Sequence, residues 1–409
     1  MRRRLSSRAL DQLINSASSA LFSFGLLAAS DSRTLGAITL QMTAVAVGLG
    51  LARTSCYEGL LMKIDDAHDP SAHLPIRVAA AGAIVVGVIG ALTGWLLGLP
   101  EEVNLTIALS SAVVMMFDGL RFTSFLLKCA GAAVRADLWW FLGTAAGLLI
   151  LIGADALTPA KVAIVYASAC ATGSLWFLPL RRQTTRLTSF RPQRSFADLR
   201  FGLDYLLQVA PAYVALIAGG AVASLAAIGE LRAALIVFSP LGSAIYAIRL
   251  AILRPDQAET RGRTIPRSAV VYGTVSAVYG AVVLGLFTAW PDELSASLAT
   301  ISIGILAYVA IGEVGRFASQ GFIDENRKAG LLRPAIGLRG GQGIALVALS
   351  AGLAAGGGAK GLGQARSIAY LVPLIAWFVL NARRSFHAPL EGDGAPPDRA
   401  TRDSHSDAV

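Results

Sequence analysis

The stretch AVVMMFDGLRF, residues 112–122, places an acid and an arginine inside an otherwise apolar run. The stretch VAIGEVGRF, residues 309–317, repeats the pattern: an acid, an arginine three residues later and then a phenylalanine. Asp118 and Arg121 share one face of a helix and can pair with each other, and the second stretch offers the same geometry. What surrounds these two charged pairs decides the fold class.

The composition is that of a membrane protein. The 409 residues are 55% hydrophobic and 15% charged, whereas soluble proteins carry roughly 25% charged residues. Several uncharged stretches run close to ~20 residues, the length a helix needs to cross about 30 Å of hydrocarbon. They show no sustained period-2 alternation, which excludes strands. We therefore expect an all-α integral membrane protein.

About twelve membrane-spanning helices account for the apolar stretches. We place them at 10–30, 35–61, 77–99, 103–127, 136–154, 159–180, 201–225, 229–252, 268–290, 294–318, 334–355 and 365–382. The glycine-rich segment 356–364 is expected to be a flexible turn, because Lys360 is followed by glycine and no strand precedes it, unlike a phosphate-binding loop.

The basic residues predict the orientation. Of the 35 Lys and Arg, 26 fall in segments on the side of both termini and five on the other side, Arg232 and Arg366 among them. Short cytoplasmic loops are enriched in Lys and Arg, so both termini are expected to be cytoplasmic. The net charge of +9 is then a topology signal that also favours contact with membrane lipids. It gives no support to nucleic-acid binding.

Two halves of the chain resemble each other. Asp11 and Gly36 match Asp204 and Gly229 at an offset of 193, and the charged pairs match at 195. The offsets predict two parallel six-helix bundles around a central cavity, where such transporters bind substrate. The expected domains are the N-terminal bundle 1–180, a basic cytoplasmic linker 181–200, the C-terminal bundle 201–385 and a disordered cytoplasmic tail 386–409.

Four arginines, two in each half, belong to neither the cytoplasmic nor the opposite group of basic residues and are taken to lie inside the membrane spans. A charge inside a bilayer costs about 2.5 kcal/mol or more, so such residues usually face a partner or a polar cavity. Guanidinium forks bind phosphate oxygens in a bidentate way. The predicted substrate-binding residues, which would converge on one cavity, are Arg53, Arg121, Arg249 and Arg316. The alternative is that these arginines extend to the membrane surface and only anchor their helices.

Polar groups near these arginines could line the cavity or form ion pairs with them. The candidates are Asp11, Gln12, Glu58, Asp118, Asp204 and Glu313. Asp11 and Asp204 open the first and seventh predicted spans, where a carboxylate favours a helix N-terminus, so capping is the first expectation for both. The acids could instead do no more than neutralise the neighbouring arginines.

Enzyme chemistry finds no support in the residues. All four histidines lie outside the predicted spans, and no Ser–His–Asp arrangement is evident. The three cysteines lie singly in apolar segments, with neither a metal-binding spacing nor a disulfide pair. We expect no enzyme activity, no metal and no cofactor.

The stretch LDQLINSASSALFSFGLLAASDSRTLGAITLQMTAVAVGLGLARTSCYEGLLM, residues 10–62, resembles the opening of bacterial polysaccharide flippases of the O-antigen type. This family belongs to the multidrug/oligosaccharidyl-lipid/polysaccharide exporter superfamily. The similarity rests on Asp11–Gln12, on the step Leu35–Gly36 and on Arg53 followed by Glu58. Family members often have 14 helices, and an aromatic residue usually follows the Leu–Gly step, where this chain has Ala37.

The resemblance implies a multi-pass transporter of the bacterial plasma membrane. It would flip an undecaprenyl-diphosphate-linked saccharide to the outer leaflet by alternating access, with a glycan polymerase or glycosyltransferase as possible partner. A cation-coupled antiporter of small drugs or metabolites is the alternative, since Asp118 and Glu313 could exchange a cation. A membrane scaffold for glycan-assembly enzymes is the third hypothesis, and it does not explain the buried charges.

Overall fold

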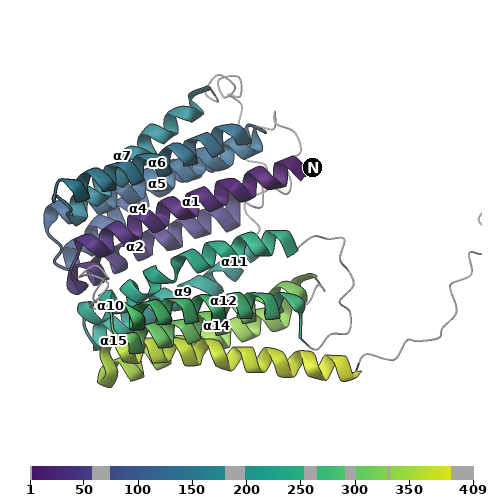
Figure 1. Ribbon diagram of the computed structural model, residues 1–409. Helices are drawn as coiled ribbons and strands as arrows, with labels where there is room; N and C mark the ends of the chain where they lie inside the picture. Colours follow the sequence, from purple (N-terminus) through teal and green to yellow (C-terminus); the bar gives the residue numbers. More distant parts are fainter. Residues whose placement is uncertain are drawn as a thin grey trace, which may run out of the picture.

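The computed structural model describes residues 2–57, 74–179, 199–252, 265–290, 301–328 and 332–387. These residues are almost entirely helical (Figure 1). The elements are α1 Arg2–Ala29, α2 Ser32–Ala52, the π-helical turn η1 Arg53–Tyr57, α4 Leu74–Leu96, α5 Glu101–Leu126, α6 Ala130–Gly153, α7 Pro159–Gly173, the 3₁₀ turn η3 Ser174–Phe177, α9 Leu199–Val222, α10 Leu225–Val237, α11 Ser239–Ile252, α12 Arg267–Ala289, α14 Ile303–Lys328 and α15 Leu332–His387.

The helices form two bundles, one from α1 to α7 and one from α9 to α15 (Figure 1). In the first, α4 packs on α5 and α1 on α6; in the second, α12 packs on α14 and α9 on α15. The predicted all-α membrane fold with two bundles is confirmed. The predicted linker 181–200 and tail 386–409 lie almost entirely outside the described residues.

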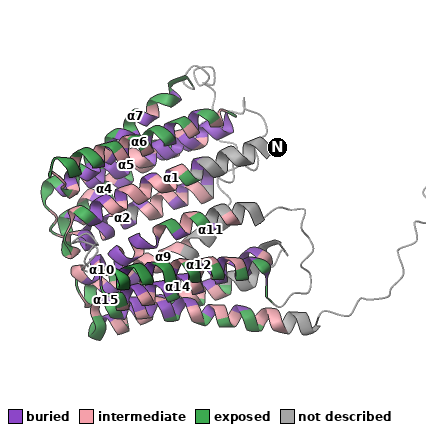
Figure 2. Ribbon diagram, in the orientation of Figure 1, coloured by how far each residue is buried: buried purple, intermediate pink, exposed green. Residues whose placement is uncertain are grey.

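The outer surface of the bundles is apolar, as a lipid-facing surface must be. Seven described helices are long and apolar enough to cross a membrane, or eight if α10 and α11 form one bent span. Figure 2 shows exposed residues along the outward faces of α4, α6, α12 and α15. On α4 these include Ile84, Trp95 and Leu96, each more than two-thirds exposed. Exposed hydrophobic side chains at this density are stable only in contact with lipid.

Interlocking aromatic rings form the core of the first bundle. Phe22 of α1 stacks on Tyr166 of α7 with ring centroids 4.0 Å apart. Trp140 of α6 contacts both Tyr166 and Phe117, at 4.9 and 5.0 Å. This cluster holds α1, α5, α6 and α7 together, because aromatic pairs in these arrangements add to the energy of burial.

The two bundles meet where α2 crosses α10. Each helix begins with a side-chain cap: Asp31 accepts from the Thr34 amide at 2.7 Å, and Ser224 accepts from the Ala227 amide at 3.1 Å. Five residues after each cap comes a glycine, Gly36 on α2 and Gly229 on α10. The caps and the glycines occupy equivalent places in the two bundles, at the offset of 193 that the sequence indicates.

Two predicted boundaries were wrong. The span expected at 229–252 is two helices, α10 and α11, bent by 42° beside Pro240, which cannot donate a backbone hydrogen bond. The turn expected over 356–364 is instead helical on both sides of Gly358, whose φ of 51° breaks α15. The chain bends there so tightly that position 361 must be glycine, because a Cβ on Gly361 would lie 2.0 Å from the Leu353 carbonyl oxygen.

Candidate functional site

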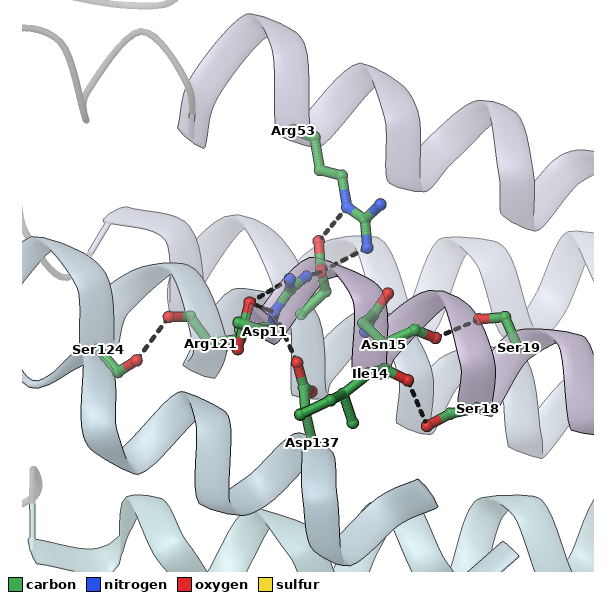
Figure 3. A network of polar contacts seen from close by, with 10 residues as sticks. Asp11, Ile14, Asn15, Ser18, Ser19, Arg53, Arg121, Ser124 and Asp137 are labelled. Carbon is green, nitrogen blue, oxygen red and sulfur yellow. Dashed lines mark hydrogen bonds and ion pairs between the residues drawn. The ribbon is translucent and has the colours of Figure 1, made fainter. Parts of the chain in front are cut away.

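Arg121 on α5 is the centre of a buried ion-pair network in the first bundle (Figure 3). Only 2% of this residue is exposed. Its guanidinium donates two hydrogen bonds to Asp11 of α1, one of them from Nε at 2.7 Å. Asp137 of α6 lies 3.2 Å from Nε, and Asp118 lies one helical turn away at 3.5 Å. Three carboxylates from three helices therefore surround one arginine.

Arg53 extends the network from α2. It begins the π-helical turn η1, a form of helix that is often found at functional sites. Its Nε and Nη2 donate to the two oxygens of Asp118 at 2.8 and 2.6 Å, the bidentate geometry of a strong arginine–carboxylate pair. About a quarter of the Arg53 side chain is exposed. Arg53 is thus the more accessible of the two bases.

Among the residues that the structure describes, the network holds one acid more than it has bases. Three carboxylates, Asp11, Asp118 and Asp137, face the two guanidinium groups of Arg53 and Arg121. Neither oxygen of Asp137 accepts a hydrogen bond with good geometry, and one oxygen of Asp11 accepts none. Asp137 also interacts electrostatically with Asp11 and Asp118. A buried excess of negative charge is costly unless a bound proton or cation neutralises it.

The second bundle reverses this balance. Glu313 of α14 accepts from Arg316, one turn later on the same helix, and from Arg366 of α15 at 2.7 Å. Both arginines also lie over aromatic rings, Arg316 at 4.0 Å from the centroid of Phe317 and Arg366 at 4.9 Å from that of Tyr370. One carboxylate therefore serves two guanidinium groups.

A cavity of about 510 Å³ opens beside this cluster. The described residues that line it run from Val209 to Tyr370, so it lies inside the second bundle and not between the two bundles. Its charged lining residues are Arg232, Glu313, Arg316, Arg339 and Arg366. The volume is within the range of roughly 300–1,000 Å³ typical of small-molecule sites.

The predicted substrate-binding arginines do not all meet. Arg316 lines the cavity, whereas Arg53 and Arg121 are held by carboxylates of the first bundle. Arg249 lies in α11, and its side chain is outside the described residues, as are the side chains of Gln12 and Asp204 and the whole of Glu58. A role of the four arginines in binding substrate stays a prediction.

Capping was the wrong expectation for Asp11. The helix α1 begins at Arg2, so Asp11 lies more than two turns inside it, fully buried against Arg121. The ion pairs predicted within each stretch, Asp118 with Arg121 and Glu313 with Arg316, are both present. The structure adds a second partner for each acid from another element, Arg53 for Asp118 and Arg366 for Glu313.

Four residues of these clusters escaped the sequence analysis, namely Asp137, Arg232, Arg339 and Arg366. Arg232 and Arg366 were counted with the non-cytoplasmic side because each falls within the first turn of its predicted span, at 229–252 and 365–382. The N-capping signal at Ser224 could have moved the start of α10 and placed Arg232 two turns inside it. Asp137 could have been noticed as an acid within a predicted span, but the sequence shows no basic residue near it in the same helix turn facing the same way.

The sequence matches no family model and none of the curated proteins with which it was compared. Solved structures share the fold. One is the outward-facing conformation of a multidrug resistance MATE family transporter of the MOP superfamily: 13% identity, TM-score 0.60, covering 93% of this chain and 95% of that one. The inward-facing conformation of such a transporter gives 14% identity and a TM-score of 0.62, over 92% and 94%.

A third neighbour is a MOP superfamily transporter from Pyrococcus furiosus, described by the reverse polarity of its binding pocket and a suggested different function. It is 12% identical with a TM-score of 0.58, over 93% of this chain and 95% of that one. This chain therefore shares the two-bundle fold of these transporters. Specific membership of the O-antigen flippase family finds no further support in these likenesses.

Proposed function

We propose that this chain is an alternating-access membrane transporter, an antiporter of small drugs or metabolites driven by exchange of a cation. The observation that carries the proposal is the excess acid around Arg121, in a fold that neighbouring structures show in both inward- and outward-facing conformations. Two carboxylates that lie close together cannot both stay ionised cheaply, so they share a proton readily. Asp11 and Asp137 form such a pair beside Arg121.

Coupling follows from the position of the acids. Asp11, Asp118 and Asp137 belong to α1, α5 and α6, so taking up a proton changes the forces between three helices at once. With a proton bound, the network is neutral, and it can pass through the low-dielectric state between the two conformations at lower cost. The cation would then move one way and the substrate the other.

Proton-driven transport in reconstituted vesicles tests the proposal. An imposed pH gradient should drive movement of a dye or metabolite, accompanied by proton flux that an entrapped pH indicator reports. Asp137→Asn keeps the shape of the side chain and removes the exchangeable charge. We expect it to reduce gradient-driven transport at least ten-fold.

The control is Glu102→Gln, an exposed acid at the start of α5, which should transport like the wild type. Transport of Asp137→Asn that still follows the gradient would remove the proposed coupling site. Wild-type vesicles that move neither dye nor metabolite under a gradient would remove the antiporter function.

A second candidate is the flipping of an undecaprenyl-diphosphate-linked saccharide across the bacterial plasma membrane. The arginine-rich lining of the cavity in the second bundle supports it, because guanidinium groups bind phosphate oxygens well. Vesicles containing a short-chain lipid-diphosphate sugar separate the two candidates: translocation of this lipid without gradient-driven dye efflux favours the flippase. Glycan-assembly enzymes would be its partners.

A further inference from the structure

The cavity of the second bundle has a strong excess of positive charge. Four arginines and one glutamate line it, which leaves three positive charges unbalanced along the wall. Asp324 offsets one of them, since it accepts from Gln320 of the wall at 2.7 Å, and Gln320 in turn contacts Arg339. Among the described residues, these groups therefore carry two more positive charges than negative ones.

These arginines are not membrane-surface anchors. Arg339 is only 4% exposed, and the Arg366 side chain only 15%. Arg232 comes seven residues after the start of α10 and Arg366 eight after Gly358, so both lie about 10–12 Å from the end of the bundle, at 1.5 Å per residue. An anchoring arginine extends to the lipid headgroups, whereas these three line a cavity inside the protein.

Two of these guanidinium groups have hydrogen-bonding capacity to spare. Arg232 makes no hydrogen bond or ion pair with any residue that the structure describes, and its strongest neighbours are Tyr213 and the like-charged Arg366. The buried Nε of Arg366 has no hydrogen-bond partner. A guanidinium carries five N–H donors in a fixed fork, so free donors of two arginines border one cavity.

We propose that this cavity is a binding site for a phosphate-bearing anion. Arg232 and Arg366 would hold the anion, and Arg316 would supply a third positive charge. Two unbalanced positive charges are best neutralised by a ligand with two negative charges. A phosphate monoester or a diphosphate carries two, whereas a single carboxylate carries one. Bidentate contact between arginine and phosphate supplies the geometry.

The source of the phosphate can be a free metabolite or a lipid headgroup, since both present the same oxygens. The proposal that an anion binds rests on the cavity alone. The further step, that this anion is the transported substrate, rests on the proposed function. A transporter with one acidic and one basic cluster would couple a proton in the first bundle to an anion in the second.

Calorimetry on the full chain in phosphatidylcholine nanodiscs tests the site. The probes are inorganic pyrophosphate for the free anion and farnesyl diphosphate for the lipid-linked one. We expect the wild type to bind at least one probe. Binding of farnesyl diphosphate alone identifies a lipid headgroup as the source, and binding of pyrophosphate identifies a free anion.

Arg232→Gln should weaken the probe that binds at least ten-fold. The fold should persist, because Arg232 pairs with no carboxylate among the described residues whose charge the change would expose. The matched control is Arg135→Gln, an exposed arginine of α6 in the other bundle, which should bind as the wild type does. If Arg232→Gln does not fold, Arg232→Lys serves instead: it keeps the charge, loses the fork and should bind several-fold more weakly.

The proposal is overturned if the wild type binds neither probe, or if the Arg232 variant binds as tightly as the wild type. Its failure differs from that of the proposed function. Intact pyrophosphate binding without proton-driven transport removes the antiporter and leaves the site, whereas proton-driven transport without phosphate binding leaves the antiporter with a different cargo.

Discussion

Individual charged side chains differ sharply in how much they contribute to the stability of the fold. Arg121 faces three carboxylates in an almost fully buried place, so its removal would leave acids unpaired in low dielectric. By contrast, Arg135 is exposed and donates only to the Gly131 carbonyl and lies over Trp176. Breaking a buried ion pair by removing one partner costs about 3–5 kcal/mol, whereas exposed pairs contribute about 0–1 kcal/mol.

We therefore expect Arg121→Leu to lower the free energy of unfolding by about 3–5 kcal/mol. Titration with a denaturing detergent in mixed micelles measures it. Arg135→Leu, the control, should change the value by less than about 1 kcal/mol. Adding Asp11→Asn to Arg121→Leu should restore part of the loss. Equal stability of the Arg121 and Arg135 variants would contradict the charge network.

At the scale of the helices, the crossing of α2 and α10 brings the backbones of the two bundles into close contact. A Cβ on Gly36 would lie 1.9 Å from the Leu225 carbonyl oxygen, and a Cβ on Gly229 would lie 1.7 Å from that of Ser32. The two contacts are reciprocal, as the pseudo-symmetry of the bundles requires. Only glycine allows these backbones to approach so closely.

Gly36→Ala should drive α2 and α10 apart and favour a conformation in which this end of the molecule is open. Spin labels at Arg33 and Val222, both exposed, report the separation once the three native cysteines are replaced. We expect the population ratio to shift at least about ten-fold, equivalent to about 1.4 kcal/mol.

Gly229→Ala should act in the same direction as Gly36→Ala. The matched control is Gly285→Ala on α12, where a Cβ meets nothing within 4 Å. An unchanged distance distribution in Gly36→Ala would show that the crossing does not restrain the two bundles.

At the scale of the whole molecule, the orientation in the membrane is still a prediction from the basic residues. Short cytoplasmic loops collect Lys and Arg, so both ends of the chain should lie in the cytoplasm. Alkaline phosphatase, which is active only outside the cytoplasm, should be inactive when fused after His387 and active when fused after Gly98. The opposite pattern would contradict the orientation.

The polarity of the two bundles is also a property of the whole molecule. Each bundle repeats the same arrangement of helices, yet among the described residues the buried cluster of the first has an excess of acid and the cavity of the second an excess of arginine. Asp137 belongs to the fifth helix of the first bundle, and Arg339 lies on the corresponding part of α15. If both proposals hold, this opposite charge on a duplicated scaffold separates the proposed site for cations from the proposed site for anions.

The sequence by itself determined the membrane class, the number of spans and the duplication. Span length, hydrophobicity and the local pairs Asp118–Arg121 and Glu313–Arg316 depend on neighbours along the chain, so they can be read without a structure. Even the two glycines at the bundle crossing were visible, as matching positions at one offset. The backbone atoms that these two glycines contact could not be identified from the sequence.

Only the tertiary structure decided where the charges meet. Asp11 and Arg121 are 110 residues apart in sequence, and Glu313 and Arg366 are 53 apart. Such pairs form because helix packing brings the two side chains together and excludes water, which no local pattern encodes. For the same reason Arg366, which the sequence places at the very start of a predicted span, lines a cavity in the fold.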